Sequence, residues 1–250
     1  MPAVVGNSNY WRESSRPLPS LLFIAPMILV YELGILLLGP QAARNGADVW
    51  LRSGLESLGF AQHFLLPMLT CGLLLAWHHH RRERWTVDTT VIGGMAVESA
   101  AFGVLLLLAA KAISLVVATP AAFELSRSPW TSPGLGRVIG YLGAGIYEEL
   151  MFRLLLLPPA MAGLAALGLG RRWSCWWAGL ATSLLFAAAH YQVDLELFGT
   201  AVHWYGEPFR AGTFLFRVLA GGFFSALFLL RGFGIAAGAH ALYDILVVLL

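Results

Sequence analysis

The sequence predicts an all-α fold, a polytopic transmembrane helix bundle of about seven helices, or eight if one short segment also crosses the membrane. Of the 250 residues, 58% are hydrophobic and only 12% are charged. A soluble domain usually carries about a quarter charged residues, so this composition argues against an ordinary soluble protein. Apolar runs fill nearly the whole chain, which predicts a single membrane domain over residues 1–250 without a separate soluble module.

The individual helices are predicted from the lengths of the apolar runs. A run of about 20 apolar residues can cross the hydrocarbon core as a helix. Prolines mark several ends, and Pro26 and Pro67 fall inside runs, where membrane packing tolerates a kink. Residues 159–170 are too few for a further span and are interpreted as an interfacial or re-entrant connection. The expected spans are 20–39, 59–77, 90–118, 134–157, 173–191, 210–230 and 233–250.

Charge placement predicts the orientation and excludes one class of partner. The arginines lie in short clusters between the apolar runs, and the net charge is only +2. Such a chain has no basic face for nucleic acid. Cytoplasmic segments are enriched in Lys and Arg, so the clusters predict a multi-pass protein with a cytoplasmic N-terminus. They are Arg12 and Arg16, Arg81, Arg82 and Arg84, Arg171 and Arg172, and Arg231.

Three charged residues interrupt the apolar stretch YEELMFRLLLLP: Glu148, Glu149 and Arg153. Inserting an ionised side chain at the centre of a membrane helix costs about 2.5–3.5 kcal/mol, whereas a leucine favours insertion by only about 0.3–0.6 kcal/mol. Residues four apart share a helix face, so Glu149 and Arg153 are expected to form an ion pair. Glu148 points elsewhere and has no partner on its own helix. We therefore interpret Glu148 as the free, functional carboxylate.

Two later helices could supply partners for Glu148. Phe186 and His190 are four residues apart, as are His240 and Asp244. A lone membrane histidine is often only a helix-to-helix hydrogen bond, but here two histidines accompany two glutamates and an arginine. A glutamate in a low-dielectric cavity can act as a general base for water, and histidines can stabilise the oxyanion of a tetrahedral intermediate. Together, these groups predict amide-bond hydrolysis.

The order of these groups resembles a known family. The pattern E-E-x-x-x-R begins at Glu148, F-x-x-x-H ends at His190, and H-x-x-x-D ends at Asp244. In this order on successive membrane helices, the patterns resemble the three motifs of the CPBP family of type II CAAX prenyl endopeptidases and Abi proteins. The resemblance predicts a CPBP-like catalytic region over residues 134–250. The helices of residues 1–133 carry no motif that we could match.

The resemblance implies a hydrolase, namely a glutamate-dependent intramembrane protease. It implies that Glu148 activates water, that Glu149 with Arg153 supports it, and that His190 orients the water or the base. It further implies an oxyanion site formed by His240 and residue 244, with Phe186 as the candidate substrate-binding residue. Many members have asparagine where this chain has Asp244, and an ionised aspartate cannot donate to an oxyanion. Asp244 is therefore either protonated, or orients His240, or belongs to a metal site.

The resemblance implies no cofactor and no metal, but zinc is an open alternative. Two histidines with one or two carboxylates form a plausible Zn²⁺ ligand set, although the HExxH signature is absent. A proton-coupled transporter, in which the same groups relay protons, and a non-proteolytic member of the family are further alternatives. The expected partners are membrane lipid and a peptide or protein substrate, with the C-terminal tail of a lipidated protein as one candidate.

Overall fold

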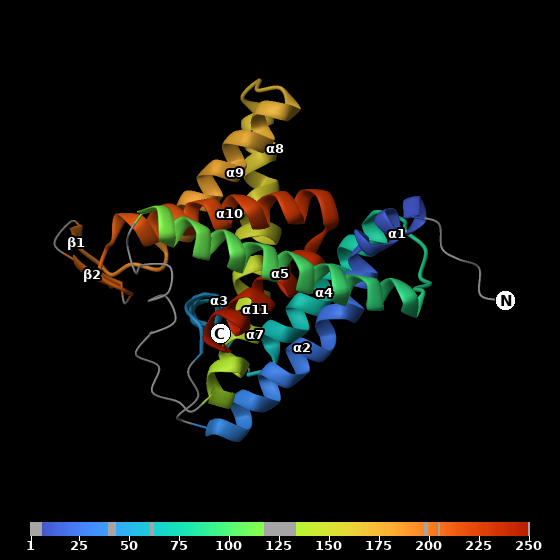
Figure 1. The fold of residues 1–250 in the computed structure, drawn as a ribbon, viewed down its shortest axis with the longest axis horizontal. Helices are drawn as coiled ribbons and strands as arrows, with labels where there is room; N and C mark the ends of the chain where they lie inside the picture. Colours follow the sequence, from blue (N-terminus) through green and yellow to red (C-terminus); the bar gives the residue numbers. More distant parts are fainter. Residues whose placement is uncertain are drawn as a thin grey trace.

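The computed structural model describes residues 7–39, 44–60, 63–117, 134–197, 200–204 and 206–249. In this part of the chain, helices account for nearly all of the structure, and one short β-hairpin lies between two of them (Figure 1). The helices are α1 (Asn7–Ser14), α2 (Pro17–Leu38), α3 (Gly46–Ser57), α4 (Leu65–His80), α5 (Thr89–Val117), α7 (Gly134–Glu149), the π-helix η2 (Leu150–Leu156), α8 (Leu157–Ala166), α9 (Arg171–Ala188), α10 (Ala211–Arg231) and α11 (Phe233–Leu249). Strands β1 (Val193–Leu197) and β2 (Thr200–Trp204) pair antiparallel.

The prediction of a helical membrane bundle is confirmed. Within the described ranges, four helical segments are long and apolar enough to cross a membrane, and α11 is a shorter apolar helix. Each of the seven predicted runs coincides with a helix, although α4 and α9 do not meet the same length and hydropathy criteria. The cytoplasmic location of the N-terminus stays a prediction. The four candidate spans are Pro17–Leu38, Thr89–Leu115, Gly134–Ala166 and Ala211–Arg231.

The outer surface is apolar, as a lipid-facing surface should be. Large hydrophobic side chains are exposed along α2, α5 and α10, among them Leu29, Leu37, Leu108 and Leu230. A soluble monomer rarely leaves extended apolar patches in water, because exposing them costs free energy. These side chains therefore fit contact with lipid.

Four elements differ from the sequence predictions. Helices α1 and α3 were not predicted, because neither contains a long apolar run. Residues 159–170, interpreted as a connection, continue the helix as far as Ala166. Pro158 and Pro159 do not break it; they lie at the start of α8, directly after the π-helix η2. The loop between α9 and α10 contains the β-hairpin.

Helix α11 lies at the centre of the bundle and packs chiefly against α5 and α7 (Figure 1). Its first nine residues, 233–241, are all buried. Glycines permit this close packing: a Cβ on Gly145 of α7 would lie 2.6 Å from both the Cβ and the backbone nitrogen of Ala241. A Cβ on Gly238 would lie 2.6 Å from the Phe23 ring. The close approach of α7 and α11 brings the polar residues of the two helices together.

An ion pair ties the N-terminal helix to the bundle. Arg231, at the end of α10, donates from Nε and Nη2 to the two carboxylate oxygens of Glu98 on α5, at 2.5 and 2.7 Å. The same guanidinium donates to Ser14 Oγ at 2.8 Å and packs 3.7 Å from the ring centroid of Trp11. Bidentate contacts of this kind are the strong form of the arginine–carboxylate pair. Helix α1 is thereby fixed against α5 and α10.

Candidate functional site

The three predicted motifs meet where α7, α9 and α11 come together. Glu148 and Glu149 are the last residues of α7, and the following turns, which contain Arg153, form a π-helix. Short π-helical stretches frequently occur at functional sites. His190 lies just past the end of α9, and His240 lies in the middle of α11. The expectation that these helices supply partners for Glu148 is confirmed.

Glu148 is the centre of the site. Its Oε2 lies 3.8 Å from Nε2 of His190 and 3.8 Å from Nε2 of His240. This oxygen is buried and has no hydrogen-bond partner among the described residues. The other oxygen, Oε1, accepts a hydrogen bond from Nδ2 of Asn45 at 3.1 Å. One carboxylate oxygen is therefore held in place, and the other faces two imidazoles.

The hydrogen bonds of the two histidines determine which ring nitrogens face Glu148. His190 Nδ1 lies 2.8 Å from the carbonyl oxygen of Phe186, which can only accept, so Nδ1 carries the proton. His240 Nδ1 lies 2.8 Å from Glu149 Oε1, and a carboxylate paired with an arginine is likewise an acceptor. The neutral form of each imidazole therefore presents an unprotonated Nε2 to Glu148. Water can donate one proton to Oε2 and the other to a ring nitrogen.

Glu149 and Arg153 form the predicted ion pair. Arg153 Nη1 lies 3.0 Å from Glu149 Oε1, and both side chains are almost completely buried. Arg153 Nη2 donates to the carbonyl oxygen of Gly221 at 3.1 Å, and its guanidinium carbon lies 4.4 Å from the ring centroid of Phe186. Because the same Glu149 oxygen also contacts His240, the pair fixes one of the two site histidines. The sequence had not predicted this second contact.

The two remaining predicted residues, Asp244 and Phe186, both lie close to the histidines. Asp244 Oδ2 is 3.6 Å from His240 Nε2, a position that suits the interpretation that Asp244 orients His240. Phe186 is 3% exposed, and its ring centroid lies 5.0 Å from that of His190 and 5.9 Å from that of His240. Phe186 therefore packs between the imidazoles, and its contact with substrate stays a prediction. Phe224, which the sequence analysis missed, stacks on His240 at 4.4 Å.

Asn45 is the most important residue that sequence reasoning missed. Its side-chain oxygen accepts from the backbone N–H of Asp48 at 2.7 Å and so caps the N-terminus of α3. Asparagine is among the best N-cap residues. With its oxygen used for the cap, its amide nitrogen is oriented to donate to Glu148. An asparagine before an amphipathic helix was the available sequence signal, but nothing in the sequence connected it with Glu148.

A buried network holds α3 beside the site. Arg52 of α3 donates from Nη2 to Glu32 Oε1 at 2.8 Å and from Nε to Asp48 Oδ1 at 2.6 Å. Glu32 Oε1 also accepts from the hydroxyl of Tyr147 at 2.7 Å, and Asp48 Oδ2 accepts from the hydroxyl of Tyr31 at 2.7 Å. Tyr147 directly precedes Glu148 in the chain. The network therefore joins α2, α3 and α7 next to the catalytic candidate.

The zinc alternative can be tested against the spacing of the donors. Ligands lie about 2.0–2.1 Å from a tetrahedral zinc ion, which places neighbouring ligand atoms about 3.4 Å apart. Glu148 Oε2 is 3.8 Å from each histidine Nε2, which is wider than this spacing. In the part of the chain that the structure describes, no group of three or more His, Cys, Asp or Glu side chains is arranged to hold a metal ion. The donors have suitable chemistry but not the spacing of a metal centre.

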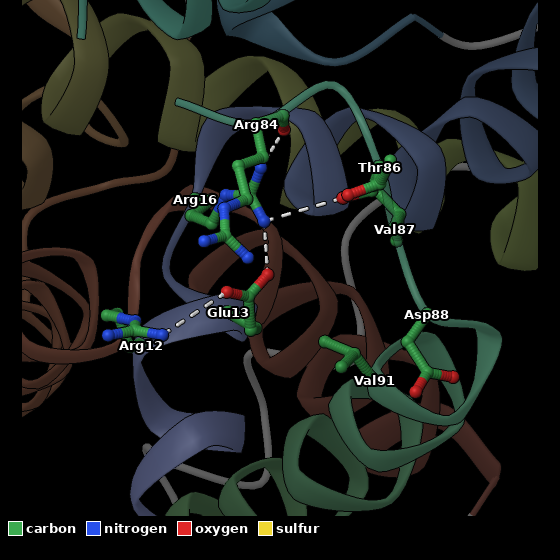
Figure 2. Close-up of a pocket in the computed structure, with 8 residues that line it drawn as sticks. All are labelled: Arg12, Glu13, Arg16, Arg84, Thr86, Val87, Asp88 and Val91. Carbon is green, nitrogen blue, oxygen red and sulfur yellow. Dashed lines mark hydrogen bonds and ion pairs between the residues drawn. The ribbon is translucent and has the colours of Figure 1, made fainter. Parts of the chain in front are cut away.

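A separate pocket lies between α1 and the segment that joins α4 to α5 (Figure 2). Its volume is about 380 Å³, and none of its lining residues belongs to the site around Glu148. Arg16, which is buried there, contacts the carboxylate of Glu13 and the backbone carbonyls of Arg84 and Thr86. These contacts hold α1 to the α4–α5 connection, so we interpret the pocket as a structural junction.

Comparison with known proteins identifies the region that contains the site. Residues 130–246 match a family model described as "Type II CAAX prenyl endopeptidase Rce1-like". The match covers just under half of the chain and includes Glu148, Glu149, Arg153, Phe186, His190, His240 and Asp244. Residues 130–246 are thus similar to this family. Neither a curated protein nor a solved structure matches the chain at a significant level.

The resemblance found in the sequence is thereby confirmed. The matched family consists of membrane-embedded peptide hydrolases that act on peptide or protein substrates. Asn45 lies outside this region, yet its amide nitrogen donates to Glu148 inside it. The site therefore contains residues from both halves of the chain.

Proposed function

We propose that this protein is an intramembrane endopeptidase that hydrolyses a peptide bond near the membrane, with the C-terminal tail of a prenylated CAAX protein as the substrate class. In this proposal, Glu148 is the general base for water. One observation carries it: a buried carboxylate oxygen of Glu148 faces the Nε2 atoms of His190 and His240, each at 3.8 Å. The family match supports peptide hydrolysis over the transporter alternative.

The nucleophile is a water molecule held between Glu148 and His190. Glu148 Oε2 and His190 Nε2 are both acceptors when the glutamate is ionised and the imidazole is neutral, so a bridging water satisfies both. Glu148 removes one proton as the water oxygen attacks the scissile carbonyl carbon. Glu148 then gives this proton to the nitrogen of the leaving peptide as the C–N bond breaks. A positioned general base of this kind contributes about 10²–10⁴-fold to the rate.

His240 is the donor for the oxyanion in this mechanism. When it is doubly protonated, Nδ1–H is held by Glu149 and Nε2–H points into the site, where Asp244 lies 3.6 Å away. The Nε2–H can then donate to the carbonyl oxygen as negative charge develops on it. Asp244 acts here by orienting and charge-stabilising the imidazolium. This role requires no proton on Asp244, so the aspartate is compatible with the mechanism.

Glu149 and Arg153 position this donor. The Glu149 carboxylate bridges Arg153 and His240, and the rings of Phe186 and Phe224 pack around the guanidinium at 4.4 and 5.5 Å. Removing one partner of a buried ion pair leaves an uncompensated charge, which costs about 3–5 kcal/mol. The pair therefore acts as a rigid support. The proposed mechanism requires no metal.

The test is cleavage of a fluorogenic, prenylated CAAX peptide by the purified full-length protein. Wild type and Glu148→Gln are compared with and without a strong chelator, and Glu56→Gln, an exposed glutamate on α3, is the matched control. We expect Glu148→Gln alone to abolish cleavage, by at least about 10²-fold, with no effect of the chelator. Cleavage that survives Glu148→Gln would refute the mechanism. Cleavage that the chelator stops would favour the zinc-dependent alternative.

A further inference from the structure

A second buried arginine, Arg217, lies next to the site, and one of its two Nη atoms has no hydrogen-bond partner among the described residues. Arg217, on α10, is 5% exposed, and its Nη2 donates to Glu207 Oε2 at 2.9 Å. Its Nη1 is buried and has no hydrogen-bond partner among the described residues. Buried arginines usually meet a carboxylate with two parallel N–H donors. A buried N–H group without an acceptor is costly, so the geometry leaves room for a second acceptor on Nη1.

The position of Arg217 is fixed relative to His190. The Glu207 backbone N–H donates to the carbonyl oxygen of His190 at 2.9 Å, and the Gln192 N–H donates to the carbonyl of Glu207 at 3.0 Å. Glu207 therefore lies beside the residues that follow α9, and Arg217 packs with its guanidinium carbon 5.0 Å from the ring centroid of Tyr191. The guanidinium also interacts electrostatically with both His190 and Asp244. Arg217 is thus a cation at the edge of the site, on the side where α9 ends and α10 begins.

The charges around it indicate what Arg217 would bind. Glu148, Asp244 and Glu207 are all acidic, so a peptide bringing a negative group into this region would be repelled without a nearby cation. Arg153, the other buried arginine of the site, is already paired with Glu149. The contact with Glu207 shows that the Arg217 guanidinium can bind a carboxylate. The Glu207 side chain is 37% exposed, whereas that of Arg217 is 6% exposed, so Glu207 is free to move while the guanidinium stays.

We propose that Arg217 binds the free C-terminal carboxylate of the peptide substrate, beside or in place of Glu207. This inference rests on the proposed peptidase function. A CAAX sequence is defined by its distance from the C-terminus, and three extended residues span at most about 10–11 Å. A cation that holds the terminal carboxylate would therefore fix which peptide bond reaches Glu148. Arg217 would act as a substrate-binding and specificity-determining residue that neither of the two histidine motifs contains.

The test uses two prenylated peptides that are identical except for a C-terminal carboxylate or a C-terminal amide. The ratio of kcat/KM for the acid to kcat/KM for the amide is measured for wild type, Arg217→Gln and Glu207→Gln. We expect wild type to prefer the acid by about 10- to 100-fold, as for loss of a charge-assisted contact. In Arg217→Gln the ratio should fall to about one, because cleavage of the acid decreases while cleavage of the amide persists. Glu207→Gln keeps the cation and should keep the preference.

Three results would overturn the inference, and one of them also overturns the proposed function. A wild type that cleaves both peptides equally well would show that no carboxylate is recognised. Equal loss on both peptides in Arg217→Gln and in Glu207→Gln would assign the ion pair to holding the hairpin in place. No cleavage of either peptide by wild type would contradict the proposed peptidase function itself. In the first two results the wild type still cleaves peptide, so only the role of Arg217 is contradicted.

Discussion

The substitution Asn45→Asp tests whether the N-terminal half of the chain contributes to catalysis. It removes the N–H donor that lies 3.1 Å from Glu148 Oε1 and places a carboxylate there instead. Hydrogen bonds to charged groups contribute about 1.5–3 kcal/mol, and each 1.36 kcal/mol changes a rate by a factor of ten. We therefore expect kcat to fall by about 10- to 150-fold. Aspartate is as good an N-cap as asparagine, so α3 should remain folded.

The assay is cleavage of the prenylated peptide, with kcat and KM measured separately and thermal unfolding in detergent measured alongside. Asn45→Ser is the matched control, because serine also caps a helix but is too short to donate to Glu148 and adds no charge. Asn45→Ser should unfold at the wild-type temperature and lose kcat. Asn45→Asp should lose more kcat and unfold at a lower temperature, because it adds a second buried carboxylate beside Glu148. Wild-type kcat in both variants would refute the idea that Asn45 positions Glu148. A lowered unfolding temperature in both would instead assign Asn45 to the α3 cap alone.

Two further substitutions test the supports of the site. Glu149→Gln leaves Arg153 as a buried cation without its carboxylate. We expect the free energy of unfolding in detergent to fall by about 3–5 kcal/mol. An unchanged unfolding temperature would contradict the importance of the buried pair. Gly145→Ala forces a Cβ to within 2.6 Å of the Ala241 backbone, so it should separate α7 from α11 and abolish cleavage. Gly179→Ala, where nothing lies within 4 Å of the added Cβ, is its control and should retain activity. Full activity in Gly145→Ala would show that the helices can move apart without harm.

The sequence predicted those parts of the molecule that depend on local spacing. Apolar runs located the membrane helices, because burying a span in lipid requires about 20 apolar residues whatever the tertiary structure. The four-residue spacing predicted the Glu149–Arg153 pair, which the structure confirms at 3.0 Å. The expectation that His190 and His240 supply partners for Glu148 rested on the cost of isolated polar groups in the membrane. Both predictions used only helix geometry and desolvation.

What the sequence did not predict depends on contacts between distant segments. Asn45 lies 103 residues before Glu148, and no periodicity links the two. The π-helical turns after Glu149 arise from packing, since their sequence, LMFRLLL, is as suited to an ordinary α-helix. Arg217 lies in an apolar run that is long enough to predict a membrane helix, and nothing in the sequence marks it as a residue of the site. Each of these features became visible only when the side chains of several helices were placed together.

The buried network of Glu32, Arg52 and Tyr147 has a consequence for modularity. The family match begins at residue 130, but Tyr147 inside it shares a carboxylate with Arg52, which lies well before it. A fragment cut at the family boundary would keep every motif residue and lose both the carboxylate and the arginine. An exchange of N-terminal halves between two relatives would likewise have to transfer this charge arrangement as a unit. The segment that matches the family therefore does not contain all of the side chains that surround Glu148.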